Sequence, residues 1–475
     1  MNAPIARLYL VVVLLFAVLI AFTSNWTVFG AEQLQDNAKN RRELLEQQRI
    51  RRGVIRADDD SLLARSVRHS DGTYSRTYPD DALFAHAVGY SYTRFGRSGL
   101  EQFRNDELTG TGNELGSLFD RLSGSEPEGD DVSTTLDPGA QRVALEGLAG
   151  RKGAVVALDP QTGAIKVMAS TPGYDPNDIA DPGSFTRLNR DDNAPLLNRT
   201  TQSGYPPGST FKVVTAIAAI DSGRYTPDSR VSGENGKPIS GVPLNNFGNE
   251  DFGDITLTEA LTNSVNTVWA QVGEDLGGET MQRYMDRLGF GAPVQVDLPE
   301  SERRASGEFR GGRPIPATSR FADVGRMAIG QDRLNVTPLQ MAMVAAAVAN
   351  GGRLMEPHLT DRVVDRDGRT VDRIQPREMA QVMSESSANE VADMMANVVR
   401  EGSGTAAALQ GIDVGGKTGT AEVDRPCGPN QVWFIAFAPQ DDPKVAVATT
   451  IECSEGTGGV VAAPIAKQVM QELLR

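Results

Sequence analysis

The sequence predicts an α+β fold whose main domain holds a sheet closed by the two ends of that domain. Strand patterns begin and end residues 134–475, and helical patterns lie between them. This order makes the first and last strands neighbours in one sheet, with helices on its faces. The chain has 475 residues, which is enough for two or three domains.

Two hairpins supply the expected strands. Apolar runs at 153–159 and 164–170 flank a turn at 159–163. Near the end of the chain, residues 432–437 and 444–451 form a second pair of strands.

Helices are expected at 211–220, 338–348 and 462–474. The second is apolar on nearly every side, which indicates that it is buried. The third has one apolar face and follows two strands, so we expect it to cover the sheet. A helix lying on a membrane is the alternative.

The N-terminus predicts export from the cytoplasm. Residues 8–22 carry no charge, Arg7 precedes them, and Trp26 suits a membrane interface. An uncleaved membrane anchor is the leading interpretation, ahead of a cleaved signal peptide and a buried core helix. Either leading interpretation places the rest of the chain outside the cytoplasm, because positive charge stays inside.

A pedestal is expected between the apolar run and the main domain. Residues 32–52 are polar and rich in Arg, which indicates a helical stalk, and 53–110 alternate short segments, which indicates a small α/β module. Residues 122–133 are small and acidic, which indicates a linker or an exposed loop. The predicted domains are 1–31, 32–133 and 134–475.

Composition excludes two classes of function. Lys and Arg number 47 against 62 Asp and Glu, and the net charge of −15 makes nucleic acid an unexpected partner. Two Cys and three His occur without the spacing of a metal site, so no metal is expected.

The first chemical motif is Ser209-x-x-Lys212, which follows the turn-forming residues 205–208. A spacing of three places both side chains on one face of a helix that begins at or just after the serine. A serine is a weak nucleophile without a base, and a lysine supplies one when burial and neighbouring charge lower its pKa. A capping serine beside an unrelated surface lysine is the alternative.

The second motif is Ser264-Val265-Asn266. Its hydroxyl suits proton relay, and its carboxamide suits recognition of a substrate amide. A simple turn or helix cap has the same pattern.

The third motif is Lys417-Thr418-Gly419-Thr420, whose small and polar residues indicate a strand beside a cleft. Lys417 suits a carboxylate, Gly419 lets a substrate backbone approach closely, and the Thr420 N–H suits an oxyanion. Residues 411–418 also satisfy the pattern of a phosphate-binding loop. A helical pattern precedes them and an extended one follows, which is the reverse of such a loop, so nucleotide binding is not expected.

The three motifs, in this order and at this spacing, resemble the signatures of penicillin-binding proteins and serine β-lactamases. Val265 stands where many β-lactamases have Asp, which fits a transpeptidase. The resemblance implies a penicillin-binding transpeptidase domain, with an antiparallel sheet between helical layers, on a small N-terminal pedestal and a membrane anchor.

Other segments resemble class B penicillin-binding proteins, so that the resemblance covers most of the chain. These segments are Arg52-Gly53-Val54-Ile55, residues 96–101, Gly330-Gln331, residues 337–342 and Trp433-Phe434. Asp332 departs from the glycine that usually follows Gly-Gln in this family. The length and the short pedestal are most similar to the actinobacterial penicillin-binding protein A group.

The resemblance implies a D,D-transpeptidase that cross-links peptidoglycan stem peptides through an acyl-enzyme and is acylated by β-lactams. Ser209 would be the nucleophile and Lys212 its base, while Ser264 would relay a proton and Asn266 would hold the stem peptide. Lys417, Thr418 and Thr420 would bind the terminal carboxylate beside Gly419, and the N–H groups of Ser209 and Thr420 would form the oxyanion hole.

The resemblance implies no metal ion or organic cofactor. It implies stem peptides, β-lactams, the membrane, a polytopic lipid-II polymerase and division or elongation proteins as partners, and an extracytoplasmic catalytic domain. A pedestal that serves only as a spacer is the alternative for the protein partners. The competing functions are a D,D-carboxypeptidase or β-lactamase on the same fold, and a non-catalytic cell-wall scaffold or β-lactam sensor.

The two cysteines flank the last hairpin, whose symmetry pairs residue 431 roughly with 452. This pairing brings Cys427 close to Cys453, and an oxidising exterior favours a disulfide between them at the rim of the cleft. Two free thiols are the alternative.

Overall fold

The structure is a computed structural model, and it describes residues 3–24, 48–111, 128–423 and 428–475. Helix α1, Ala3–Ser24, contains the apolar run at 8–22. Its apolar side chains are exposed, as Leu14 at 60% and Phe16 at 61% illustrate. No helix among the described residues is both long and apolar enough to cross a membrane. The predicted boundary at residue 31 and most of the predicted stalk, up to residue 47, lie outside the described residues.

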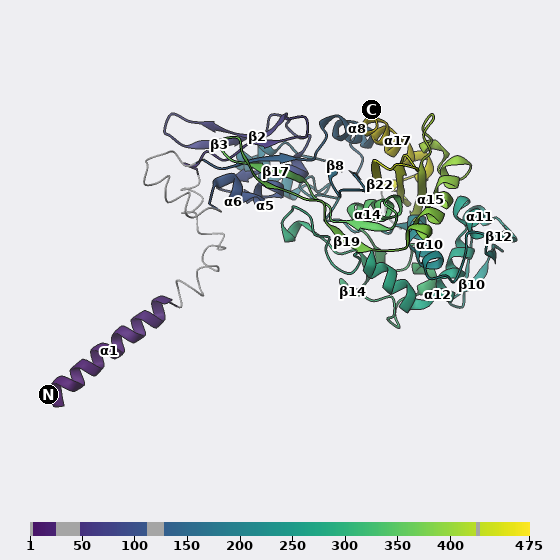
Figure 1. Cartoon of the computed structure of the whole chain (residues 1–475), viewed down its shortest axis with the longest axis horizontal. Coiled ribbons are helices and arrows are strands. Elements are labelled where there is room, and N and C mark those ends of the chain that lie inside the picture. The colour runs from purple at the N-terminus through teal and green to yellow at the C-terminus, as the bar shows by residue number, and fades with distance from the viewer. Residues whose placement is uncertain (1–2, 25–47, 112–127, 424–427) are drawn as a thin grey trace.

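A six-stranded sheet forms the core of the N-terminal part, in the order β18-β17-β6-β1-β2-β3. Its strands are β1 (Ile55–Arg56), β2 (Leu62–Arg68), β3 (Tyr74–Thr77), β6 (Asp131–Thr134), β17 (Thr360–Val364) and β18 (Thr370–Arg373). Helices α4 (Ala85–Val88), α5 (Gly99–Phe103) and α6 (Asn105–Thr109) and the small pair β4 (Ser91–Tyr92) and β5 (Gly96–Arg97) accompany it. Two strands thus come from far along the chain, and they lie beside the purple strands in Figure 1.

The prediction that 122–133 form a linker or exposed loop is wrong for its last residues. Asp131–Thr134 form β6, which lies between β17 and β1, and Val132 is fully buried. Residues 122–127 lie outside the described residues. The sequence does not predict this strand, because its small polar residues pair with strands that are distant in the chain and only Val132 has an apolar side chain that indicates burial.

The second sheet has five antiparallel strands in the order β20-β21-β22-β7-β8. They are β7 (Gly153–Leu158), β8 (Ile165–Thr171), β20 (Gly415–Glu422), β21 (Asn430–Ala438) and β22 (Val445–Ser454). β22 pairs with β7 from Ala446↔Leu158 to Ile451↔Gly153. Both predicted hairpins are confirmed, and the sheet is closed by the two ends of its domain as expected.

Helices cover both faces of this sheet (Figure 1). On one face α8 (Pro138–Leu148) and α17 (Ala463–Leu473) pack against Val155, Phe434 and Val447. On the other, α14 (Pro338–Ala349) packs against Val156, Ile435 and Ala448. Successive side chains of a strand point to opposite faces of the sheet, so neighbouring residues pack into the two different cores. The prediction that the last helix covers the sheet is confirmed.

Beyond α14 lies a helical and loop region that frames the site. Its helices are α10 (Lys212–Asp221), α11 (Leu257–Thr262), α12 (Asn266–Arg287), α13 (Val324–Met327), α15 (Glu385–Arg400) and α16 (Gly458–Val461). Its small strands are β9 (Arg230–Ser232), β10 (Lys237–Ile239), β11 (Val242–Leu244), β12 (Asp254–Thr256), β13 (Gly307–Arg310), β14 (Arg313–Ile315), β15 (Leu334–Asn335), β16 (Arg353–Met355) and β19 (Glu378–Gln381). Helix α9 (Pro182–Arg190) lies elsewhere and packs through Phe185 and Leu188 against a small cluster formed by Ala85, Tyr174 and Ile179. A cap fixes the start of α14. The side-chain hydroxyl of Thr337 accepts a hydrogen bond from the Gln340 N–H, and Pro338 occupies the first helical position, as the sequence favours.

Candidate active site

Ser209 lies in a single 3₁₀ turn, Gly208–Phe211, that leads directly into α10. Two contacts fix this turn from outside: the Gly208 N–H donates to the Gly330 carbonyl at 3.0 Å, and the Trp433 indole N–H donates to the Pro206 carbonyl at 2.9 Å. The helix therefore begins where the sequence predicts. Ser209 is half-buried and faces a cleft.

Lys212 is fully buried, one turn after Ser209. Its Nζ donates to the Ser264 carbonyl at 2.6 Å and to Asn266 Oδ1 at 2.7 Å, and lies 3.3 Å from Ser264 Oγ. Burial and the charge of Lys417 hold the pKa of Lys212 well below its usual value. Lys212 is thus buried beside Ser209 and is not the unrelated surface lysine of the alternative interpretation.

Ser264 lies between α11 and α12 with a left-handed φ of 58°. Such a conformation is strained for a serine and is found mostly where the surroundings enforce it. Asn266 is the first residue of α12, and both ends of its carboxamide form hydrogen bonds. Its Oδ1 accepts from Lys212, and its Nδ2 donates to the Asn245 carbonyl at 2.9 Å. One N–H of this carboxamide is left for a substrate.

Lys417 lies on β20, an edge strand of the five-stranded sheet, and is fully buried. Its Nζ donates to Ser264 Oγ at 2.8 Å and to the Thr418 carbonyl at 3.1 Å. Burial lowers its pKa to about 7. Residues 415–418 of the phosphate-binding-loop pattern thus belong to an edge strand that continues to Glu422, where a phosphate-binding loop would open a helix.

Gly419 is required by the packing of the protein itself. A Cβ at this position would lie 2.7 Å from the Pro207 carbonyl oxygen and 2.9 Å from Thr210 Cγ2. Glycine therefore lets β20 approach the turn that carries Ser209, which brings the first and third motifs together.

A cleft of about 660 Å³ joins the three motifs. Ser209, Ser264, Asn266, Thr418 and Thr420 all line it, and Lys212 and Lys417 reach it through Ser264. The lining also includes residues that the motifs do not contain, namely Asn245, Phe247, Arg326, Gln331, Ser403, Glu422, Asn430 and Thr457. Only Gln331 had a sequence signal, because it belongs to the Gly-Gln pair.

Asp332, which follows that pair, has a φ of 65°. This left-handed conformation explains why glycine is usual there. Asp tolerates it better than most residues, since its short side chain bonds locally. Asp332 Oδ2 lies 3.4 Å from the Arg333 Nη1.

The structure shows no metal centre: among the residues it describes, no three His, Cys, Asp or Glu side chains gather to hold an ion. Cys453 is the second-last residue of β22, has a left-handed φ of 57° and is disulfide-bonded. Cys427, its predicted partner, lies outside the described residues, so that pairing stays a prediction.

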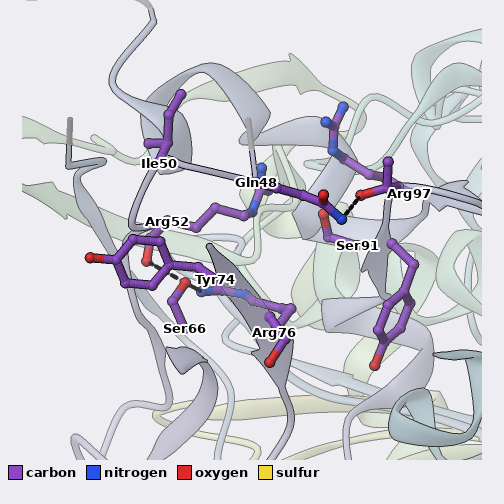
Figure 2. A pocket seen from close by; sticks show the side chains of 11 residues that line it. Gln48, Ile50, Arg52, Ser66, Tyr74, Arg76, Ser91 and Arg97 are labelled. Carbon is purple, nitrogen blue, oxygen red and sulfur yellow. Dashed lines mark hydrogen bonds between the residues drawn. The ribbon is translucent and has the colours of Figure 1, made fainter. Parts of the chain in front are cut away.

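The two pedestal motifs meet in a buried ion cluster. Glu101 accepts from Arg52 Nη2 at 2.7 Å and from Arg76 Nε, and it is fully buried. Figure 2 shows both arginines at the wall of a cavity of about 120 Å³, where Ser66 Oγ donates to the Arg52 carbonyl at 3.0 Å. This cluster ties β3 and α5 to the segment before β1.

A serine at a helix start, a buried lysine one turn later and a Lys-Thr-Gly edge strand define the active-site-serine class that penicillin recognises. The chain belongs to the penicillin-binding protein transpeptidase family. A family model described as "Penicillin binding protein transpeptidase domain" matches residues 153–471, and one described as "Penicillin binding protein A dimerisation domain" matches residues 52–132.

Relatives match along almost the whole chain. Peptidoglycan D,D-transpeptidase PbpA of Mycolicibacterium smegmatis is 34% identical, over 100% of this chain and 99% of its own. The structure of penicillin-binding protein A from M. tuberculosis as a ceftriaxone acyl-enzyme complex is similar at a TM-score of 0.82, with 32% identity over 91% of this chain and 100% of that chain. The D,D-transpeptidase domain of an Eggerthella lenta peptidoglycan glycosyltransferase has a TM-score of 0.79 and 36% identity, over 90% and 98%.

Proposed function

We propose that this protein is a serine-type D,D-transpeptidase that cross-links peptidoglycan stem peptides and is acylated by β-lactams. One observation carries the proposal: a buried lysine with a lowered pKa lies one turn after a cleft-facing serine and shares Ser264 with Lys417. The relatives named as peptidoglycan D,D-transpeptidases, and the acyl-enzyme complex of one similar structure, support the same activity.

The hydrogen bonds of Lys212 support its role as the base. A neutral amine has two N–H donors and one lone pair, and the two short contacts, to the Ser264 carbonyl and Asn266 Oδ1, use both donors. The lone pair is then left for a proton from Ser209. A protonated lysine has three donors and no lone pair, so it could not take that proton.

The proposed reaction has two halves. Ser209 Oγ attacks the carbonyl of the penultimate D-Ala and gives its proton to Lys212; the C–N bond then breaks, and the terminal D-Ala leaves with a proton passed through Ser264. The amine of a second stem peptide next attacks the acyl-enzyme, loses a proton by the same route and frees Ser209. The N–H groups of Ser209 and Thr420 would hold the oxyanion in each half.

The edge position of β20 suits recognition of the donor peptide. An edge strand presents unpaired backbone groups, so an extended stem peptide can lie along it while Asn266 holds its backbone. The terminal carboxylate would lie against Lys417, Thr418 and Thr420, beside Gly419.

Acylation of the detergent-solubilised full chain by a fluorescent penicillin tests this function. We expect one stable adduct that maps to Ser209 and disappears in Ser209→Ala, while Ser222→Ala, at the far end of α10, keeps it. A donor peptide and an added D-amino acid should then give release of D-Ala and an exchanged product. Rapid turnover of nitrocefin would indicate a β-lactamase, release of D-Ala without exchange a carboxypeptidase, and no adduct on folded protein a scaffold.

We also propose that α1 attaches the chain to a membrane and leaves the catalytic domain outside the cytoplasm. The support is its row of exposed apolar side chains between Leu8 and Phe22, which water solvates poorly. Sodium carbonate extraction of cells that express the full chain should leave it in the membrane fraction. Release into the wash, or an N-terminus trimmed beyond residue 22, would contradict an uncleaved anchor.

The pedestal at 32–133 is the proposed surface for a polytopic lipid-II polymerase and for division or elongation proteins. The family model that matches 52–132 is described as a dimerisation domain, which supports a role in contacts between proteins. Photocrosslinking from exposed positions of β2, with Arg65 and Arg68 as the first choices, should capture these partners in cells. Crosslinks that appear only from the domain at 134–475 would favour the spacer.

A further inference from the structure

Ser403 lies in the cleft without belonging to any of the three motifs. Its Oγ is 2.6 Å from Thr418 Oγ1, the hydroxyl of the Lys-Thr-Gly strand. Both residues line the cleft that holds Ser209. We propose that Ser403 is a positioning residue for the carboxylate site: it orients the Thr418 hydroxyl toward the terminal carboxylate of the donor. This inference rests on the proposed transpeptidase function.

The loop that carries Ser403 is fixed on both sides. A Cβ on Gly402 would lie 2.4 Å from the Thr262 carbonyl oxygen, and a Cβ on Gly404 would lie 3.2 Å from the Phe434 ring. The Gly404 N–H also donates to the Val398 carbonyl at 2.9 Å. Neither glycine can gain a side chain without moving a neighbour, so the loop after α15 holds Ser403 in one place.

A third contact supports this placement. A Cβ on Gly459, at the start of α16, would lie 2.3 Å from the Ser403 carbonyl oxygen. The backbone of Ser403 is therefore held between α11, α16 and β20, and its exposed side chain faces the cleft.

The number of O–H donors in the Ser403–Thr418 pair leaves one donor for a ligand. Two hydroxyls have two O–H groups, and the bond between Ser403 and Thr418 uses one of them. The other is left for an acceptor in the cleft. When Ser403 donates, one lone pair of Thr418 Oγ1 is occupied, and the Thr418 proton stays available for an acceptor other than Ser403.

The surrounding charges favour an anion as that acceptor. Lys417 Nζ uses two donors, on Ser264 Oγ and on the Thr418 carbonyl, so an ammonium group has one N–H left. A carboxylate accepts at two oxygens and matches one N–H and one O–H well. The free lysine N–H and the oriented Thr418 hydroxyl thus form a site for a terminal carboxylate.

A matched pair of reagents tests the role of Ser403. Benzylpenicillin has the carboxylate that mimics the donor terminus, and its methyl ester lacks the charge. We expect Ser403→Ala to lower the second-order rate of acylation by benzylpenicillin about tenfold, the size of one hydrogen bond to a charged group, and to leave the slow rate with the ester nearly unchanged. Ser403→Thr should restore the rate, and Ser386→Ala, an exposed serine of α15, should not change it.

Coupling to Thr418 distinguishes positioning from direct contact. In a Thr418→Val background, Ser403→Ala should have almost no further effect, because the hydroxyl that it orients is gone. An equal loss with both reagents would mean that Ser403 is only structural, and a full further loss in the Thr418→Val background would mean that it acts alone; either result overturns the inference. If the wild-type protein forms no adduct at Ser209, the proposed function fails first, and that outcome is separate from these.

Discussion

The Nζ atoms of Lys212 and Lys417 lie on either side of one atom, the hydroxyl oxygen of Ser264, at 3.3 and 2.8 Å. Both lysines are fully buried, so neither charge is solvated by water. Each protonated lysine therefore disfavours a proton on the other, and the pair titrates as a unit. In the proposed mechanism this coupling would let Lys212 act as the base while Lys417 acts as a cation.

The pH dependence of acylation should reveal this coupling. Burial and the Lys417 charge both lower the pKa of Lys212, so removing that charge in Lys417→Met should raise the Lys212 pKa. The acid limb of the acylation rate then moves to higher pH, because the base stays protonated longer. Rates between pH 5 and 10 with penicillin methyl ester measure this, since the ester does not need Lys417 for binding. Lys444→Met, whose lysine is on the surface, serves as the control, and an unmoved limb would contradict the coupling.

Gly330 should be needed for acylation, because it touches the turn that carries Ser209. A Cβ there would lie 1.9 Å from the Gly208 carbonyl oxygen, so Gly330→Ala must displace the turn that carries Ser209. A shift of about 1 Å at a nucleophile is expected to lower acylation by about a hundredfold. Gly311→Ala is a matched control, because Gly311 has the same left-handed backbone and no atom within 4 Å. Both variants should lose stability in thermal unfolding because of the left-handed backbone, and Gly330→Ala should lose more because of its clash; a similar loss of acylation in both would refute the argument.

The active site could be predicted from the sequence to the extent that its parts are local. The spacing of Ser209 and Lys212 determines that they share a helix face, and the alternation around Lys417 determines a strand. Their convergence on Ser264, more than 50 residues from Lys212 and more than 150 from Lys417, was expected only from the family resemblance. Ser403 was missed altogether, because a lone serine between glycines has the pattern of any loop.

The fold shows the same limit. Hairpins such as β21 and β22 were predicted because their partners are adjacent in sequence. β6 was missed, since its partners are β1 and β17, and Val363 pairs with Val132 across more than 200 residues of chain. A short strand with one buried apolar residue has no period of its own, so only the tertiary structure identifies it.

The buried ion cluster of the pedestal should contribute more to the free energy of unfolding than an exposed ion pair does. Burial opposes ionisation of Glu101, but Arg76 and Arg52 outweigh it and lower its pKa. Glu101→Gln leaves two buried arginines without a counter-charge and should cost about 3–5 kcal/mol in urea unfolding at pH 7. Asp367→Asn breaks the exposed pair with Arg369 and should cost less than about 1 kcal/mol. Equal costs would mean that the cluster is solvated in solution.

Glu308 should make the protein less stable as the pH rises. It is fully buried on β13, and neither carboxylate oxygen has a hydrogen-bond partner among the described residues. Burial, with Asp332 adding to it against a weaker opposing effect of Arg333, raises its pKa to about 8. The folded protein then keeps a proton that the unfolded chain loses above pH 4.5, the ordinary pKa of a glutamate. By linkage, stability falls between about pH 4.5 and pH 8, because the folded state binds more protons over that range.

Glu308→Gln removes this dependence while keeping the shape of the side chain. We expect it to stabilise the protein by about 1–3 kcal/mol at pH 8.5, where the wild type must bury a charge, and to have little effect at pH 5, where the carboxyl is already neutral in the fold. Thermal unfolding of both proteins at the two pH values measures the difference. Glu378→Gln, on the exposed strand β19, should show no such change. If Glu308→Gln is equally neutral at both values, or more destabilising at pH 8.5 than at pH 5, the carboxyl has a partner in solution and its pKa is ordinary.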